Sequence, residues 1–324
     1  MTSAHIDKWV LDVSPDDHPA DVAVHSLKSR LGAVQHWLSR AAQKQDHENR
    51  EDIHQLRVWT RRAAAAMKVF APFLPRRRAA WMRKQLKRLR GAANEARDLD
   101  VLVERLARQW SESQDRPSMK ELRDQRSKSR QPIVDIHDRL KKDDRFERRI
   151  AKLLKGVRPR GPAVTQLEDQ TFGDWARDGL NPFVKEFFEA APARNADSAA
   201  LHKFRVCGKR LRYAMELLAG AFSDEFREKL YPVIETLQEE LGELNDHATA
   251  QVRLRKQLKK EEDPGEIDHL RRVRDYEAAR FEVGRQDFLN WCTPRFLTRF
   301  RAEFDQILTR PKRGSRPLSA SARR

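Results

Sequence analysis

The chain has 324 residues, with 66 Lys or Arg against 49 Asp or Glu, so its formal net charge is +17. The 12 glycines are too few for a turn-rich β protein, and the two cysteines, Cys207 and Cys292, form neither a disulfide framework nor a zinc spacing. No apolar run approaches the ~18 residues of a transmembrane helix, and the acidic N-terminus lacks a signal pattern. We therefore expect a cytoplasmic protein with no membrane partner that binds a polyanion.

The first half reads as successive amphipathic helices. Asp16 or Asp17 is expected to cap a first helix that has Pro19 near its first position, and a second helix runs from about 49 to 72. A third helix is expected over about 76–95, and a fourth is expected to begin near Arg97–Asp98, where Asp98 would act as an N-cap. A long charged helix is expected from Pro117 to about Asp143, and a shorter one carries Phe146, Ile150 and Leu153.

The segment Lys155–Pro162 has two prolines and two glycines in eight residues, which marks a linker. One helix or a broken pair follows around 172–187, and further helices are expected over about 197–221, 224–245, 247–262, 265–291 and 294–309. The predicted organisation is an acidic N-terminal segment (1–18), a first bundle (19–157), a linker (158–164), a second bundle (165–309) and a basic, disordered tail (310–324).

An internal repeat with an offset of 148 residues supports this division. His54-Gln-Leu-Arg57-Val matches His202-Lys-Phe-Arg205-Val, and Arg97-Asp98 matches Asn245-Asp246 at the same offset. Arg105 with Arg253, and Leu106 with Leu254, keep this register. The predicted fold class is therefore all-α, with two similar helical bundles related by a pseudo-twofold.

The repeated motif places cations on one helix face. His54, Arg57 and Arg61 follow at i, i+3 and i+7, and the second copy repeats the arrangement. Residues 76–90 hold eight basic residues and no acidic one, so like-charge repulsion calls for an external anion. A basic helix face is usually solvated or paired with carboxylates, but the repeated mixture of His and cations favours a binding surface. Opposed faces of this kind would form a basic groove or pore. The candidate anion-binding residues are His54, Arg57, Arg61, Arg62, Arg83, Lys87, Arg90, Arg97, His202, Arg205, Lys209, Arg210, Arg212 and Tyr213.

Arg side chains suit phosphate because their paired N–H donors match its oxygens and stay charged at neutral pH. Asp98 and Asp246 have a second interpretation, as partners that orient an Arg or His of these faces. Tyr213 either donates to a phosphate or packs at the edge of the core. No P-loop, Gly-x-Ser-x-Gly elbow or His-Glu-x-x-His motif is present, and no His pair has metal-ligand spacing, so we expect neither catalysis, nor a cofactor, nor a metal site.

The segments HQLRVWTRR (54–62), ARDLDVL (96–102), LHKFRVCGKRLRYAMEL (201–217) and LGELNDHA (241–248) resemble the CHAD family, whose name stands for conserved histidine α-helical domain. The resemblance covers about residues 19–309. It implies two helical bundles around a basic central cavity that binds inorganic polyphosphate, and association with polyphosphate granules and their proteins in bacteria. Some relatives are fused to a triphosphatase domain; this chain resembles the stand-alone form.

The two copies differ within this resemblance. Arg212 corresponds to Ala64, and the positions of Arg83, Lys87 and Arg90 correspond to Tyr231, Glu235 and Gln238. The first half is therefore expected to contribute more to binding. Two alternatives remain open at this point: a nucleic-acid-binding protein, which is the second partner class that the charge permits, and a metal-dependent phosphohydrolase.

Overall fold

The computed structural model describes residues 7–10, 12–43, 49–109, 116–161 and 167–309, and these form helices and no strand. The expected all-α class is confirmed. The predicted tail, 310–324, and part of the predicted linker lie outside the described residues. The first half comprises α1 (Pro19–Ala41), α2 (Asn49–Val69), α3 (Arg76–Gln109), α4 (Pro117–Lys128), α5 (Gln131–Lys141) and α6 (Arg145–Leu154). The second comprises α8 (Phe172–Glu189), α9 (Ser198–Leu218), a π-helical turn η5 (Phe226–Leu230), α10 (Tyr231–Leu258), α11 (Pro264–Trp291) and α12 (Pro294–Thr309).

The start of α1 differs from the prediction. The ring Nδ1 of His18 accepts a hydrogen bond from the backbone N–H of Ala20 at 3.2 Å, so His18 is the N-cap. The Asp17 carboxylate instead accepts a hydrogen bond from the backbone N–H of Ser14 at 2.7 Å. Ser14 lies before the helix, so this bond does not cap α1. Pro19 occupies the first helical position as expected, because its missing N–H and fixed φ suit that place.

α3 is one continuous helix, so the predicted break near Arg97–Asp98 is wrong and Asp98 is not an N-cap. Neither Pro nor Gly occurs between 92 and 109, and buried positions continue at helical spacing through Ala96, Leu99 and Leu102. The predicted boundary between 245 and 247 is absent for the same reason, and α10 runs through it. The opposite error occurs at α4 and α5, which are separate helices because Pro132 cannot donate to the carbonyl of Lys128.

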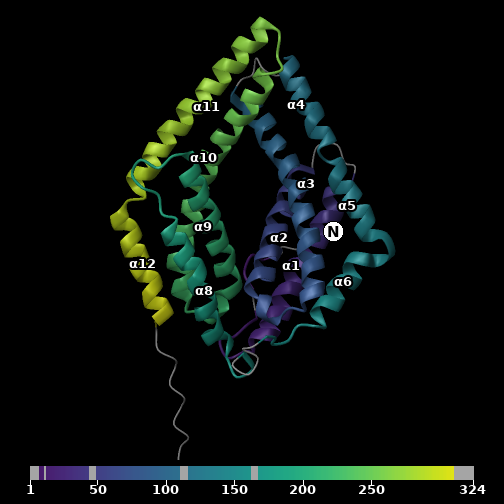
Figure 1. Ribbon diagram of the computed structural model, residues 1–324, viewed down its shortest axis with the longest axis vertical. Helices are drawn as coiled ribbons and strands as arrows, with labels where there is room; N and C mark the ends of the chain where they lie inside the picture. The colour runs from purple at the N-terminus through teal and green to yellow at the C-terminus, as the bar shows by residue number, and fades with distance from the viewer. Residues whose placement is uncertain (1–6, 11, 44–48, 110–115, 162–166, 310–324) are drawn as a thin grey trace, which may run out of the picture.

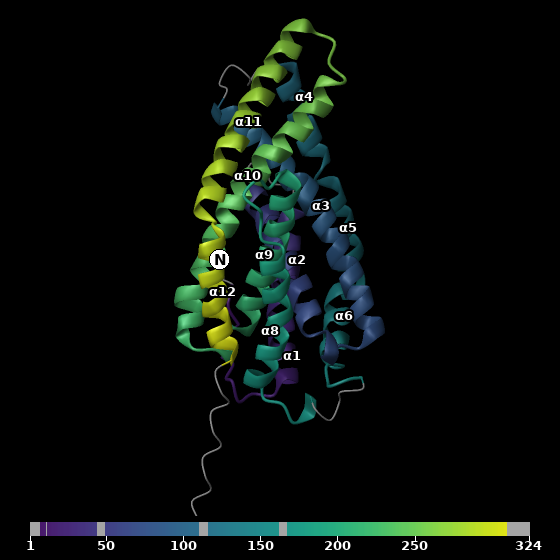
Figure 2. The same cartoon turned by 60° about the vertical axis from the view of Figure 1, so that its left-hand side comes forward.

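The two halves lie side by side (Figure 1), and the view turned by 60° shows the upper ends of α10 and α11 close to those of α3 and α4 (Figure 2). One cluster of buried apolar side chains runs through both halves. A second, smaller cluster at the upper end joins the halves through Leu102 and Leu106 of α3 and Ala250 and Leu254 of α10. None of the described helices combines the length and apolar character needed to cross a membrane.

A buried ionic cluster ties α2 to α9 between the halves. The Arg62 guanidinium donates to both carboxylate oxygens of Glu216, at 2.7 and 3.1 Å, and stacks on Trp59. The Tyr231 hydroxyl also donates to Glu216, at 2.9 Å. Arg30, which is fully buried, lies 5.3 Å from the ring centre of Trp59 and donates to the carbonyl of Asp7. Glu216 therefore neutralises Arg62, which is largely buried, and its charge also favours the buried Arg30 cation.

Candidate anion-binding site

A cavity of about 200 Å³ lies where α2 and α3 of the first half face α9 and α10 of the second. We call it the central cavity. Ten of its twelve lining residues come as five pairs separated by 148 positions: Arg57 and Arg205, Asp98 and Asp246, Val101 and Thr249, Leu102 and Ala250, Arg105 and Arg253. His54 and Arg97 complete the wall. The lining thus holds five arginines and one histidine against two aspartates.

The helical spacing of α2 and α9 creates this concentration of cations. Burial, and then the charges of Arg61 and other neighbours, lower the pKa of Arg57 to about 10. Lys209 lies one helical turn beyond Arg205, among four arginines that include Arg57 and Arg61. Burial, followed by the charges of Arg205 and Arg61, lowers the pKa of the Lys209 ammonium to about 5. Lys209 does not line the central cavity, and its lowered pKa reflects burial first and the nearby arginines second.

Several buried nitrogen atoms at the cavity have no hydrogen-bond partner within the part of the chain that the structure describes. These atoms are the Nε groups of Arg57, Arg97 and Arg205 and the Nδ1 of His54. Burial, and then the charges of Arg97 and Arg57, lower the pKa of His54 to about 4. Unsatisfied buried donors are costly, and an anion with several oxygens would supply acceptors for them.

The two histidines of the repeat are placed differently. His54 is half-buried beside Arg97, whereas His202 is exposed and its Nδ1 lies 3.0 Å from the Oδ1 of Asn245. Asn245 occupies the position that corresponds to Arg97. Only the first of the two histidines lines the central cavity.

Both aspartates of the repeat lie in the cavity wall, as the orienting role would require. Asp98 faces Arg57 and Arg253, and Asp246 faces Arg205. Burial raises the pKa of Asp98 even though the two arginines oppose that change. With Asp98 inside a continuous helix, its carboxylate is available to hold these guanidinium groups in place.

Sequence reasoning did not place Arg105 and Arg253 in the site. The Arg105 guanidinium lies 3.1 Å from a carboxylate oxygen of Glu277 and also contacts His247, while Arg253 lies 3.4 Å from Glu95. Their match at the offset of 148 was visible in the sequence, and a repeated cation one to two turns after each repeated Asp was the signal that identifies them.

The remaining candidates lie in three settings. Arg61 donates to Asn94 at 3.2 Å and contributes to the charge around Lys209. Arg62 and Arg210, which occupy equivalent positions, are held by Glu216 and Glu186 respectively, and Arg212 lies 3.8 Å from Glu235. Tyr213 is buried, and the guanidinium carbon of Arg212 lies over its ring, 5.2 Å from the ring centre. Along α3, Arg83 and Lys87 are exposed and Arg90 is half-exposed, and none of the three lines the central cavity.

The carboxylates present do not assemble into a metal site. The described ranges contain no group of three or more His, Cys, Asp or Glu side chains arranged to hold a metal ion. The thiols of Cys207 and Cys292 are buried and unpaired.

Comparison with known proteins gives one family and two related folds. A family model described as CHAD domain matches residues 27–255. The crystal structure of the CHAD domain from the plant Ricinus communis has 20% sequence identity and a TM-score of 0.64, and the alignment covers 93% of this chain and 96% of that one. PptA from Streptomyces chartreusis has 17% identity and a TM-score of 0.56, with 85% of this chain and 99% of that chain covered. A search of curated proteins finds no match.

Proposed function

This chain belongs to the CHAD domain family, and from that premise we propose that it binds inorganic polyphosphate in the central cavity and has no catalytic activity of its own. The proposal includes the finer architecture: two helical bundles related by a pseudo-twofold, whose axis passes through the cavity.

The observation that carries the proposal is the pairing of lining residues at the offset of 148. A cavity on a pseudo-twofold axis is lined by equivalent residues from each copy, and five such pairs occur here. A ligand with repeating, equivalent charged groups matches that arrangement, because each half then presents the same donors to the same chemical group. Polyphosphate is such a ligand.

The electrostatics favour phosphate over a neutral ligand. Arg57 and Arg205 offer planar forks of N–H donors, and the half-buried setting strengthens their interaction with an anion. Burial lowers the pKa of Lys209 most, and the repulsion by neighbouring arginines, which lowers it further, is relieved when a polyanion enters. The cavity volume of about 200 Å³ suits a slender ligand, since pockets for drug-sized molecules start near ~300 Å³.

The alternatives make different demands on the same residues. A metal-dependent phosphohydrolase needs a carboxylate cluster, and the described cavity wall holds two aspartates that face arginines. A nucleic-acid-binding protein would use the same positive field, but it would also need surfaces that read bases or stack on them. The paired arginines around a narrow cavity support polyphosphate as the first partner.

The test is calorimetric titration with polyphosphate of defined length and, separately, single-stranded and duplex DNA, at two salt concentrations. We expect saturable polyphosphate binding that outcompetes DNA at the higher salt. Equal or stronger binding of DNA would overturn the proposal. Release of orthophosphate in the presence of Mg²⁺ or Mn²⁺ would overturn the absence of catalysis.

Binding should also take up protons. The neutral Lys209 regains its proton beside a polyanion, so affinity rises as the pH falls from 8 to 6, by at most about tenfold per pH unit for one proton. Titrations in two buffers of different ionisation enthalpy measure this uptake. Lys209→Met should abolish most of it.

In the cell, binding of this kind would place the protein on cytoplasmic polyphosphate granules. A fluorescent fusion should co-localise with the granules, and the fusion carrying Arg57→Gln and Arg205→Gln should not.

A further inference from the structure

A second and larger cavity, of about 830 Å³, lies at the end of the molecule opposite the upper apolar cluster. We call it the tip pocket. One wall is the start of α3 with the short 3₁₀ turn before it (Ala71–Phe73), and the other is the loop that follows α6. Six of its lining residues are cationic and none is acidic: Arg76, Arg77, Arg78, Lys155, Arg158 and Arg160.

The charge of the tip pocket is not offset by its own side chains. The side-chain hydrogen bonds of its arginines run to carbonyl oxygens, from Arg78 to Lys152 and from Arg160 to Gly156 at 2.7 Å. Partial burial, and then the charges of Arg158 and Arg78, lower the pKa of Arg160. The three arginines of the first turn of α3 also stand at the positive end of the helix dipole, where acidic residues are the favoured kind.

The walls of the tip pocket are held in place by backbone contacts. The backbone N–H of Arg158 donates to the carbonyl of Phe73 at 3.0 Å, which fixes the loop against the 3₁₀ turn. A Cβ on Gly156 would lie only 2.9 Å from a guanidinium nitrogen of Arg78 and 3.0 Å from Pro75, so glycine allows this close approach. The loop turns away again at Gly161, whose φ of 91° favours glycine.

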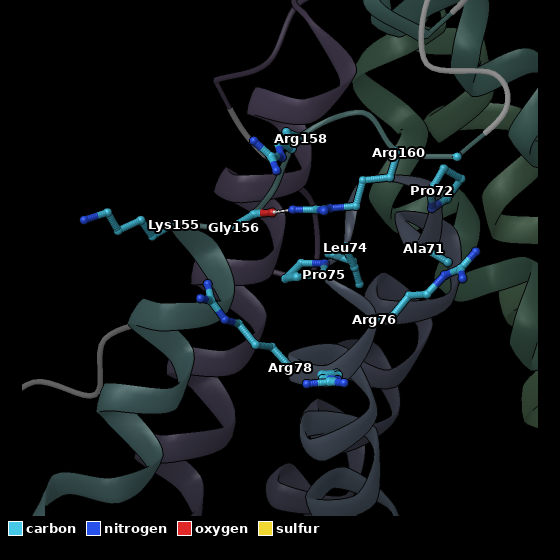
Figure 3. Close-up of a pocket in the computed structure, with 12 residues that line it drawn as sticks. Ala71, Pro72, Leu74, Pro75, Arg76, Arg78, Lys155, Gly156, Arg158 and Arg160 are labelled. Atoms are coloured by element: carbon cyan, nitrogen blue, oxygen red, sulfur yellow. Dashed lines mark hydrogen bonds between the residues drawn. The ribbon is translucent and has the colours of Figure 1, made fainter.

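The close-up of the tip pocket shows how the cations lie (Figure 3). Arg78, Arg158 and Arg160 gather around Gly156, Arg76 stands on the opposite side, and Lys155 points away. Two walls therefore present guanidinium groups to one open space. Guanidinium forks on facing walls are suited to an anion with several oxygens.

We propose that the tip pocket is a second phosphoryl-anion site, separate from the central cavity. Its own residues carry this inference, while the nature of the natural ligand rests on the proposed function. The same chemistry has two sources, a free short oligophosphate or a distant segment of a long polyphosphate chain. α3 links the two sites, because at ~1.5 Å per residue Arg76 lies about 30 Å from Arg97 along the helix.

The experiment titrates tripolyphosphate into the full chain and three variants. Arg76→Gln with Arg77→Gln removes two tip cations that sit unfavourably at the helix dipole, so the melting temperature should not fall. Arg57→Gln with Arg205→Gln disables the central cavity. Arg295→Gln with Arg299→Gln removes the same charge from exposed positions of α12, as the control.

The wild type and the α12 control should bind tripolyphosphate at two sites. The tip variant should keep the central site and weaken the other by about tenfold. The central variant should show the reverse. If the tip variant retains both sites at wild-type affinity, or if the wild type has only the site that the central variant removes, the second site is overturned. Loss of binding in the central variant alone thus tests the proposed function, and loss in the tip variant alone tests this inference.

Titration with long-chain polyphosphate separates the two sources. If a chain segment occupies the tip pocket, the tip variant should lower the affinity for long chains and increase the number of proteins bound per chain. If only its tripolyphosphate site weakens, the pocket takes a free oligophosphate.

Discussion

The two halves share a helical plan but differ in how their cations are compensated. In the first half, Lys87 and Arg90 of α3 are at least partly exposed and His54 lies beside Arg97. In the second half, Glu235 lies near both Lys8 and Arg212. A carboxylate, Glu235, thus stands in the second half at the position where the first half has the exposed Lys87.

Gly208 accounts for one further difference between the halves. It corresponds to Thr60, and Gln238 corresponds to Arg90. A Cβ on Gly208 would collide with the Gln238 amide and would lie 3.3 Å from Phe187, so glycine lets Gln238 lie buried against α9. In the first half Thr60 is buried and Arg90 is half-exposed. The position that is buried at Gln238 of α10 is thus half-exposed at Arg90 of α3.

The largest effect is expected where the halves are joined by charge. Glu216→Gln removes the carboxylate that pairs with Arg62 and acts most favourably on the buried Arg30, so the free energy of unfolding should fall by about 3–5 kcal/mol. Denaturant unfolding measures this. The control is Glu186→Gln, because Glu186 pairs with the equivalent Arg210 at the surface, where a pair contributes at most ~1 kcal/mol. Equal losses in the two variants would contradict the difference.

The next effect concerns the arginines in which the halves agree. Arg57→Gln with Arg205→Gln should reduce polyphosphate affinity about a hundredfold or more, and should make its dependence on salt shallower. Each single variant should lose a comparable part, since the pair is equivalent. Arg57→Lys with Arg205→Lys should have an affinity between those of the wild type and the Gln variant, because the charge is kept but the planar fork of donors is lost. A strongly unequal contribution of the two single variants would break the pseudo-twofold description.

A smaller effect is expected from Lys87 and Arg90 of α3, which have uncharged or acidic counterparts in the second half. Lys87→Gln with Arg90→Gln should weaken long-chain polyphosphate by about tenfold while leaving short chains unchanged. Lys229→Gln with Arg255→Gln removes the same charge from exposed positions of the second half and serves as the control. Calorimetry with two chain lengths decides the matter, and equal effects of both variants would mean that only net charge counts.

The smallest effect concerns the two histidines. Arg97→Asn gives the first half the asparagine that the second half has at Asn245, and it removes the largest charge contribution to the lowered pKa of His54. That pKa should rise from about 4 toward 6.5 without reaching it, since burial remains. NMR titration of the His54 ring measures the change.

The same variant has a consequence for stability. The pKa of His54 is lower in the folded state than in the unfolded state. Its contribution to the free energy of unfolding is therefore fully present above pH 6.5 and is lost as the pH falls toward 4. Arg97→Asn reduces the difference between the folded-state and unfolded-state pKa values of His54. Between pH 6.5 and 4, acid should therefore lower the free energy of unfolding of the variant less than that of the wild type. An unchanged acid transition would contradict the assignment to His54.

The spacing of apolar residues, together with the positions of proline and glycine, is enough to predict most of the helices. Pro19 marks the start of α1, and α6 ends at Leu154, directly before the predicted linker with its glycines and prolines. The errors arose where one local signal was weighed without its tertiary setting. Asp98 resembles an N-cap, but packing at Leu99 and Leu102 carries α3 through it, and the break at Pro132 was overlooked.

The cationic faces of α2 and α9 were visible in the sequence, but their compensation was not. Helical spacing places Arg62 and Arg210 equivalently, and only the fold shows that Arg62 meets a buried carboxylate. One signal was available: Glu216 stands in the apolar end of α9, where a carboxylate requires a partner. The tip pocket could not be anticipated, because it joins residues about 80 positions apart through a loop.

The two halves are held together by non-covalent contacts at two places, so they should stay associated even when the loop that connects them is cut. Arg62 and Glu216 join α2 to α9, and the apolar cluster around Leu102 and Ala250 joins α3 to α10. Two fragments divided within the 155–161 loop would each bury their charges and apolar surface only by re-associating. Co-expressed fragments should therefore reconstitute one particle with an intact central cavity, while the cut dismantles the tip pocket, so that a single nick separates the two sites in one molecule.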